Sequence, residues 1–148
     1  MNIYLDNCCY NRPFDNQSQE RIHLESEAVL AIIKRGRFSH DVIWGSTALD
    51  IEMGNLKDVV KKEKVAILYE IAKTKIEFSE AVLLRAKDIQ SVSSIRSFDA
   101  LHIAFAESGG LDYFITTDDR LEKACANLSL NVKVLNPLKY IVEVIDNE

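Results

Sequence analysis

The stretch Asn2-Ile3-Tyr4-Leu5-Asp6 decides the fold of this chain. Three bulky residues of high strand propensity lead directly into a carboxylate, and Asn7 then ends the apolar run. An apolar run of this kind is typical of a strand that is buried on both faces of a parallel sheet. Ligands bind beyond the carboxyl ends of the strands in such sheets, so we expect Asp6 at the functional edge. A turn or capping role is the alternative for this residue.

The composition is that of one globular domain, which we expect to cover residues 1–148. A chain of 148 residues with 47% hydrophobic and 28% charged residues can bury a single core. Only 5 Gly and 2 Pro leave little room for a flexible linker. The longest apolar run, 28–33, is too short to span a membrane, and the N-terminus lacks the pattern of a secretory signal. We therefore expect no membrane association.

The cysteines and the net charge bear on the compartment and on the partners. Cys8, Cys9 and Cys125 are odd in number and include an adjacent pair, which is a poor framework for disulfides. We expect three reduced thiols, and hence a cytoplasmic protein. The net charge of −5 argues against a nucleic-acid binder that depends on a basic footprint. It is compatible with an enzyme whose acids hold cations that contact phosphate.

Strand and helix patterns alternate along the remaining sequence. We predict further strands at 41–45, 75–78, 112–117 and 132–135, and helices at 18–35, 47–53, 56–73, 79–89, 97–108 and 120–128 and from Pro137 onward. Residues 8–16 are rich in turn formers and are expected to form a loop. This order predicts an α/β fold, a three-layer α/β/α sandwich around a mainly parallel sheet of about five strands.

Several acids are expected near the carboxyl edge of that sheet. Asp118 or Asp119 follows the strand 112–117, Asp99 lies in the first turn of the helix 97–108, and Glu52 lies on the short helix after the second strand. The plainer interpretation of the acids at 99, 118 and 119 is structural: each one caps a helix or complements the dipole of a helix. Glu25 falls on the apolar stripe of the helix 18–35, where exposure near the helix start is the simplest explanation.

Two groups of basic or titratable residues also have alternative interpretations. His102, one turn after Asp99, is expected to be a core or supporting histidine rather than a catalytic one. The lysines at 57, 61, 62 and 64 form either a solvated face or a surface that contacts phosphate, and the solvated face is the plainer interpretation.

A cluster of carboxylates points to a divalent metal ion. Neighbouring carboxylates repel one another, and without cations some of them take up protons. Mg²⁺ or Mn²⁺, which prefer oxygen ligands, resolve this repulsion. Such ions activate water and stabilise the leaving oxygen in phosphodiester hydrolysis. No glycine-rich phosphate loop, Ser/His/Asp arrangement or zinc-ligand spacing is present in the sequence.

Four segments together resemble the PIN domain family, which includes ribonuclease toxins of toxin–antitoxin pairs. They are Leu5-Asp6, Glu52, Phe98-Asp99-Ala100-Leu101-His102 and Ile115-Thr116-Thr117-Asp118. The resemblance covers nearly the whole chain, and the segments around Asp99 and Asp118 are the most specific. Asn7 departs from the Thr or Ser that the family commonly has after its first acid. The segment around Glu52 matches only loosely, so Glu25 and Glu27 remain alternatives for the fourth acid.

The resemblance implies a metal-dependent endoribonuclease, and specifically the toxin of a type II toxin–antitoxin pair. It implies a homodimer that binds RNA and an antitoxin protein. Asp6, Glu52, Asp99 and Asp118 are then catalytic, and the Mg²⁺ or Mn²⁺ ligands among them are Asp6, Asp99 and Asp118. Supporting or substrate-binding roles are expected for Asn7, Arg12, Thr116 and Asp119.

Three other functions fit the fold class. A phosphoacceptor receiver domain requires paired acids after the first strand and a lysine after the last, but Asn7-Cys8 and Leu135-Asn136 stand at these positions. A haloacid-dehalogenase-type phosphatase requires a second Asp at position 8, where this chain has Cys8. A PIN-like scaffold that binds RNA or protein without turnover is the remaining alternative.

Overall fold

The computed structural model of the protein describes residues 1–147, which are organised around a five-stranded sheet. The strands are β1 (Asn2–Leu5), β2 (Val42–Ser46), β3 (Thr74–Ile76), β4 (Tyr113–Ile115) and β5 (Lys133–Leu135). They lie in the order β3-β2-β1-β4-β5, and every neighbouring pair is parallel. The predicted parallel α/β fold is therefore confirmed.

Strand β1 occupies the centre of the sheet. Ile3, Tyr4 and Leu5 are completely buried, and Tyr4 is in register with Trp44 of β2 and Phe114 of β4. The chain builds the sheet outward from β1 in one direction through β2 and β3, and then in the other through β4 and β5. The residue that follows β1 therefore lies at the switch point of the sheet, where α/β proteins bind their ligands.

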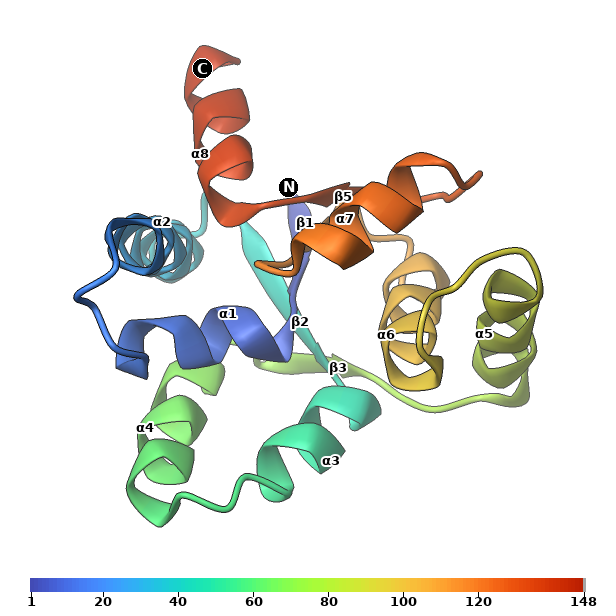
Figure 1. The fold of residues 1–148 in the computed structure, drawn as a ribbon, viewed down its shortest axis with the longest axis horizontal. Helices are drawn as coiled ribbons and strands as arrows, with labels where there is room; N and C mark the ends of the chain where they lie inside the picture. Colours follow the sequence, from blue (N-terminus) through green and yellow to red (C-terminus); the bar gives the residue numbers. More distant parts are fainter. Residues whose placement is uncertain (148) are drawn as a thin grey trace.

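Helices cover both faces of the sheet (Figure 1). One layer contains α1 (Asn7–Asn11), the 3₁₀ turn η1 (Arg12–Phe14), α2 (Glu20–Arg37) and α4 (Val59–Tyr69), and α8 (Pro137–Asp146) packs against α2. The other layer contains α5 (Glu80–Ser91), α6 (Ser97–Ser108) and α7 (Asp119–Ala126). The short helix α3 (Thr47–Gly54) contacts both α1 and α6. Crossovers between parallel strands are right-handed as a rule, so a sheet that grows from β1 in both directions carries helices on both faces.

The region after β1 differs from the predicted loop at residues 8–16. It forms α1 and η1 because the Asp6 side chain caps α1 and Pro13 suits the first turn of η1. Turn-forming residues also begin helices, so composition alone did not distinguish the two outcomes.

Two helix boundaries also differ from the prediction. Helix α2 passes through Gly36 and ends at Arg37. A Cβ atom at position 36 would lie 2.8 Å from Cδ1 of Ile43, so only glycine fits there without a shift of its neighbours. Packing against β2, rather than helix termination, accounts for this glycine. Helix α4 begins only at Val59, where Asp58 accepts a hydrogen bond from the N–H of Lys61. Among residues 1–147, no helix combines the length and apolarity needed to cross a lipid bilayer.

We expect Gly45→Ala to destabilise the protein, because β2 passes very close to α4. A Cβ atom at Gly45 would lie 2.5 Å from Oη of Tyr69, which is itself held by a hydrogen bond to Asp50 (2.8 Å). Urea denaturation should show a loss of about 1–3 kcal/mol. Gly54→Ala is the matched control: its Cβ would meet nothing within 4 Å, and alanine favours the helix by up to about 1 kcal/mol. Equal effects of the two substitutions would contradict this explanation.

Candidate active site

The structure brings the four carboxylates selected from the sequence to one pocket of about 290 Å³, which Asp15 also lines. Asp6 follows β1 and Asp118 follows the neighbouring β4, while Glu52 projects from α3 and Asp99 from the first turn of α6. Asn7 and Arg12 also line this pocket. The pocket, which we call the acid pocket, thus lies at the carboxyl edge of the central strands.

Asp6 is fixed by hydrogen bonds to both of its carboxylate oxygens. Oδ1 accepts a hydrogen bond from the N–H of Asn7 (2.8 Å), and Oδ2 accepts one from Oγ1 of Thr116 (2.9 Å). The N–H of Asp6 donates to the carbonyl of Ile115 (2.9 Å), so the ends of β1 and β4 are joined at this residue. Asp6 therefore caps α1 and lines the acid pocket at the same time.

Asp118 also combines a capping role with a place in the acid pocket. Its Oδ1 accepts hydrogen bonds from the N–H groups of Arg120 (3.0 Å) and Leu121 (3.2 Å) at the start of α7. Its own N–H donates to Oγ1 of Thr116 (3.2 Å). Thr116 thus connects Asp6 with Asp118, and the cap leaves Oδ2 of Asp118 for another ligand.

The acid pocket concentrates negative charge in a partly desolvated place. Burial raises the pKa of Asp6, and the neighbouring Glu52 raises it further, although His102 and Thr116 act in the opposite direction. Burial also raises the pKa of the half-buried Asp99 to about 6, with additional contributions from Asp6 and Asp118. Both shifts indicate that the folded chain does not compensate these charges fully, as expected of a site that binds cations.

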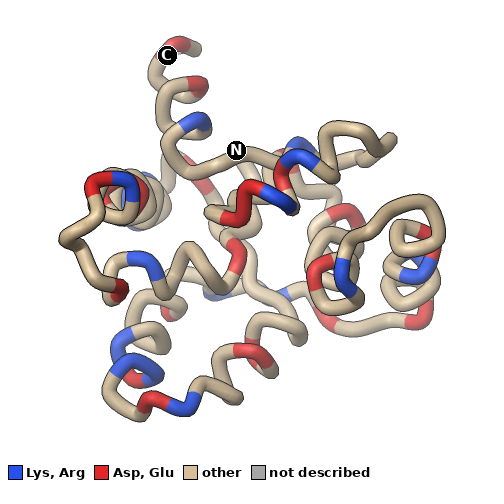
Figure 2. Tube along the Cα trace, in the orientation of Figure 1, with Lys and Arg blue, Asp and Glu red and all other residues tan. Residues whose placement is uncertain are grey.

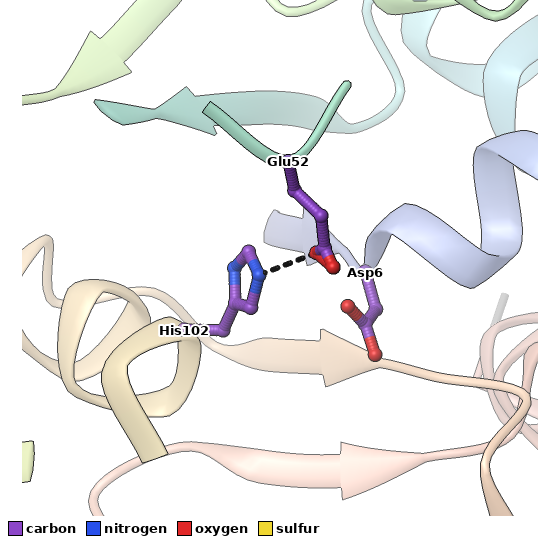
Figure 3. A group of neighbouring side chains, drawn as sticks. All are labelled: Asp6, Glu52 and His102. Atoms are coloured by element: carbon purple, nitrogen blue, oxygen red, sulfur yellow. Dashed lines mark hydrogen bonds and ion pairs between the residues drawn. The ribbon is translucent and has the colours of Figure 1, made fainter. Parts of the chain in front are cut away.

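The donor atoms fit a hard divalent cation. Ligand atoms of Asp6, Glu52 and His102 all lie within 4.8 Å of one another, and Figure 3 shows the Asp6 and Glu52 carboxylates facing each other. Nε2 of His102 is 2.8 Å from Oε1 of Glu52, so this histidine supports the carboxylate. Asp99 and Asp118 place further carboxylate oxygens in the same pocket. Carboxylate oxygens are the ligands that Mg²⁺ and Mn²⁺ prefer.

A chain of buried hydrogen bonds orients Glu52. The N–H of Leu49 donates to Oγ of Ser46 (3.0 Å), which lies 2.6 Å from Oη of Tyr4. Oη of Tyr4 lies 2.5 Å from Nδ1 of His102, whose Nε2 reaches Glu52. If the hydroxyls of Ser46 and Tyr4 donate in sequence, Nδ1 of neutral His102 accepts and its Nε2–H donates to Glu52. This arrangement agrees with the prediction from the sequence that His102 is a core or supporting histidine.

Arg12 is held at the acid pocket by two carboxylates. Its Nη1 lies 3.2 Å from Oδ2 of Asp15, and its Nε lies 3.3 Å from Oε1 of Glu25. The expectation that Glu25 is exposed was wrong, because its side chain is completely buried and accepts a hydrogen bond from Nδ2 of Asn136 (2.6 Å). Arg12, Arg21 and Asn136 together offset part of the cost of burying this charge.

Other charged candidates lie outside the acid pocket. Glu25 and the exposed Glu27 do not line it, and Asp119 forms an ion pair with Arg21 at 2.5 Å. Figure 2 shows several basic positions along α4. Of these, Lys61 pairs with Asp15 (2.8 Å), and Lys62 donates to the carbonyl of Gly54 (2.9 Å).

Sequence reasoning did not select four further residues that line the acid pocket, of which Leu56 is apolar and the other three are polar. Cys8, Asn11 and Asp15 all come from the segment that was expected to be a loop. The Sγ atom of Cys8 lies 3.5 Å from Oδ2 of Asp6 and 3.4 Å from Oγ1 of Thr116. Only their closeness to Asp6 in the sequence indicated this position.

Comparison with known proteins identifies the family. A model of the PIN domain family matches residues 3–127, and this chain therefore belongs to that family. A chain of the solved structure described as "Structure of FitAB bound to IR36 DNA fragment" has the same fold, with a TM-score of 0.56 and 19% identity. The similarity covers 91% of this chain and 94% of that chain. A search among curated proteins found no match.

We expect Asp99→Asn to stabilise the metal-free protein at pH 7.5. The pKa of Asp99 in the folded state, about 6, exceeds the ordinary value of about 3.9. Its ionisation therefore costs stability as the pH rises through 6. Thermal unfolding with a chelator should show a higher Tm for the variant at pH 7.5, and the difference should decrease as the pH falls toward 4. Glu63→Gln on the exposed side of α4 should change Tm little. A difference for Asp99→Asn that does not depend on pH would contradict the electrostatic explanation.

Tyr4→Phe tests the hydrogen-bond chain without removing the ring. The ring of Tyr4 stacks on Phe114 with centroids 5.2 Å apart, and phenylalanine preserves that contact. Loss of Oη leaves His102 and Ser46 without their shared partner, so we expect a loss of about 1–3 kcal/mol in urea denaturation.

Tyr10→Phe is the matched control for this substitution. Tyr10 is also completely buried, but its hydroxyl has no hydrogen-bond partner among residues 1–147. Its removal should be neutral or slightly stabilising. A similar loss for both variants would show that the chain of hydrogen bonds is not the cause.

Proposed function

We propose that this protein is a metal-dependent endoribonuclease that hydrolyses RNA phosphodiester bonds. The observation that carries the proposal is the convergence of Asp6, Glu52, Asp99 and Asp118 on one pocket at the switch point of a PIN domain sheet. Carboxylates in this number, with raised pKa values at Asp6 and Asp99, suit the binding of Mg²⁺ or Mn²⁺.

The four acids have two roles in the proposal. Asp6, Asp99 and Asp118 hold the metal, and Glu52, oriented by His102, positions the attacking water or assists as a ligand. A divalent cation at such a site lowers the pKa of a bound water and stabilises the charge of the phosphate. Thr116 keeps Asp6 in place through its hydrogen bond of 2.9 Å.

Two groups beside the acids are suited to the substrate. Arg12 is held by Asp15 and Glu25 at the wall of the acid pocket, where a guanidinium can contact a phosphate oxygen. Asn7 lines the same wall and receives a hydrogen bond from Nδ2 of Asn11 on its Oδ1 (3.0 Å). Asp119 supports the start of α7 through Arg21.

Membership of the PIN family also suggests a biological setting. We propose that the protein is the cytoplasmic toxin of a type II toxin–antitoxin pair, that it forms a homodimer, and that an antitoxin protein binds it. The shared fold with a chain of the DNA-bound FitAB structure supports an assembly with partner macromolecules.

Asp6→Asn should reduce cleavage of a mixed RNA pool by more than about 100-fold, because even supporting residues of metal sites contribute about 10–100-fold. The assay compares Mn²⁺, Mg²⁺ and chelator, with folding checked by circular dichroism. Asp88→Asn is the matched control, since Asp88 lies on α5 and pairs with Arg85 (2.7 Å) away from the acid pocket. Unchanged turnover of Asp6→Asn would remove this acid from the mechanism. Tight Mn²⁺ binding without cleavage by the intact protein would favour an inactive binding module.

A further inference from the structure

A second hollow, of about 350 Å³, borders the acid pocket. Asp99 and Asp118 line both spaces, so the two are adjacent. The remaining lining comes from the segment before α6 and from α7, and consists of Ser94, Ile95, Arg96, Arg120, Leu121 and Ala124. The proposed chemistry assigns no role to any of these six residues.

Two arginines give this hollow a positive wall. Arg96 immediately precedes α6, three residues before Asp99, and Arg120 lies in the first turn of α7, two residues after Asp118. Both side chains are exposed, and neither forms an ion pair within residues 1–147. Their guanidinium groups therefore remain available to bind a phosphate, for which planar pairs of N–H donors are well suited.

Besides the arginines and the polar Ser94, Asp99 and Asp118, the hollow has three apolar lining residues. Ile95 and Leu121 are buried, with 6% and 4% of their surfaces exposed, and Ala124 lies beside them. Cations on one wall and apolar side chains on another suit a nucleotide, whose phosphate is charged and whose base has apolar faces. The volume is also within the range of about 300–1,000 Å³ that small-ligand pockets occupy.

We propose that this hollow, named here the arginine hollow, binds the nucleotide adjacent to the scissile phosphodiester of a single-stranded polynucleotide. The inference rests on the proposed nuclease function and extends it to a substrate subsite. A chain with a net charge of −5 and five acids around its pocket repels a polyanion, so positive contacts beside the acids are needed to hold the strand. A base that enters the hollow has left its partner strand, which favours single strands over duplexes.

The first test measures binding of a labelled single-stranded RNA decamer with Ca²⁺ as the cation, so that binding is measured apart from turnover. Arg96→Gln and Arg120→Gln should each raise Kd by roughly 3–10-fold and reduce the slope of log K against log salt by about 0.7. Arg37→Gln is the matched control. Arg37 is exposed, has no ion pair within residues 1–147, and lines a cavity with Val42 and Thr74 at the opposite edge of the sheet.

A second test asks whether the arginines contact a backbone phosphate. One neutral methylphosphonate linkage is placed at each position of the decamer in turn. At one position the linkage should weaken binding to the unaltered protein but add no further loss in the Arg96→Gln/Arg120→Gln double variant. Fully additive losses at every position would overturn the proposal.

The outcomes separate the arginine hollow from the nuclease function. If RNA binding depends on Arg96 and Arg120 but the intact protein does not cleave RNA in Mn²⁺, the nuclease function is rejected and the nucleotide-binding role of the arginine hollow stands. If the intact protein cleaves RNA but the Arg96→Gln and Arg120→Gln variants bind the decamer as tightly as Arg37→Gln does, the nuclease function stands and the proposed role of the arginine hollow is overturned. Competition by a polyglutamate peptide as effective as by RNA would also overturn it. Binding of a DNA decamer of the same sequence shows whether the site discriminates between ribose and deoxyribose. Failure of both the RNA and the DNA decamer to bind would reject the proposal.

Discussion

The pairing of β1 with β4 is the interaction on which the rest of the site depends. These strands lie far apart in the sequence, and their parallel register places Asp6 beside the residues that follow Ile115. The hydrogen bond from Thr116 to Asp6 and the bond from the N–H of Asp118 to Thr116 then link both acids. Parallel strands end at one edge, so two carboxylates delivered by adjacent strands must meet there. The helices α3 and α6 add Glu52 and Asp99 to a place that this pairing has already defined.

The acid pocket concentrates charge at a cost in stability. Burial and mutual repulsion raise the pKa values of Asp6 and Asp99, so the ionised cluster is unfavourable in the metal-free fold. The surrounding structure opposes this cost with fixed dipoles and hydrogen bonds, among them the Thr116 hydroxyl and the chain from Ser46 to His102. Sites that bind ligands commonly retain such local strain, because the same unmet charge is what attracts a cation.

Arginine side chains are distributed unevenly around these acids. Arg12 is held by Asp15 and Glu25 on one side, whereas Arg96 and Arg120 line the neighbouring hollow without ion pairs among the described residues. The buried Glu25 illustrates how a charge inside the fold can organise a functional wall. It is enclosed by Arg12, Arg21 and Asn136, so its charge is compensated and the arginine at the pocket is fixed in position.

Much of the fold followed from local patterns. The apolar run of β1, the alternation of strands and helices, and the position of the final helix at Pro137 predicted the parallel sheet. The boundaries around residues 8–16 and at Gly36 were wrong, because caps, turns and close packing use the same residue types. The acids at positions 6, 52, 99 and 118 were selected through strand ends and family resemblance. The apolar stripe that carries Glu25 indicated burial, but exposure near the helix start was preferred because the partners of this charge are not visible in the local sequence.

The sequence by itself determined which segments become strands and where carboxylates follow them, since periodicity and propensity act within a few residues. Tertiary structure alone decided that Glu52 meets His102, that the buried Glu25 pairs with Arg12, and that Arg96 and Arg120 share a hollow. These contacts join elements that are distant along the chain. Their geometry depends on strand order, register and helix packing, which no local pattern specifies.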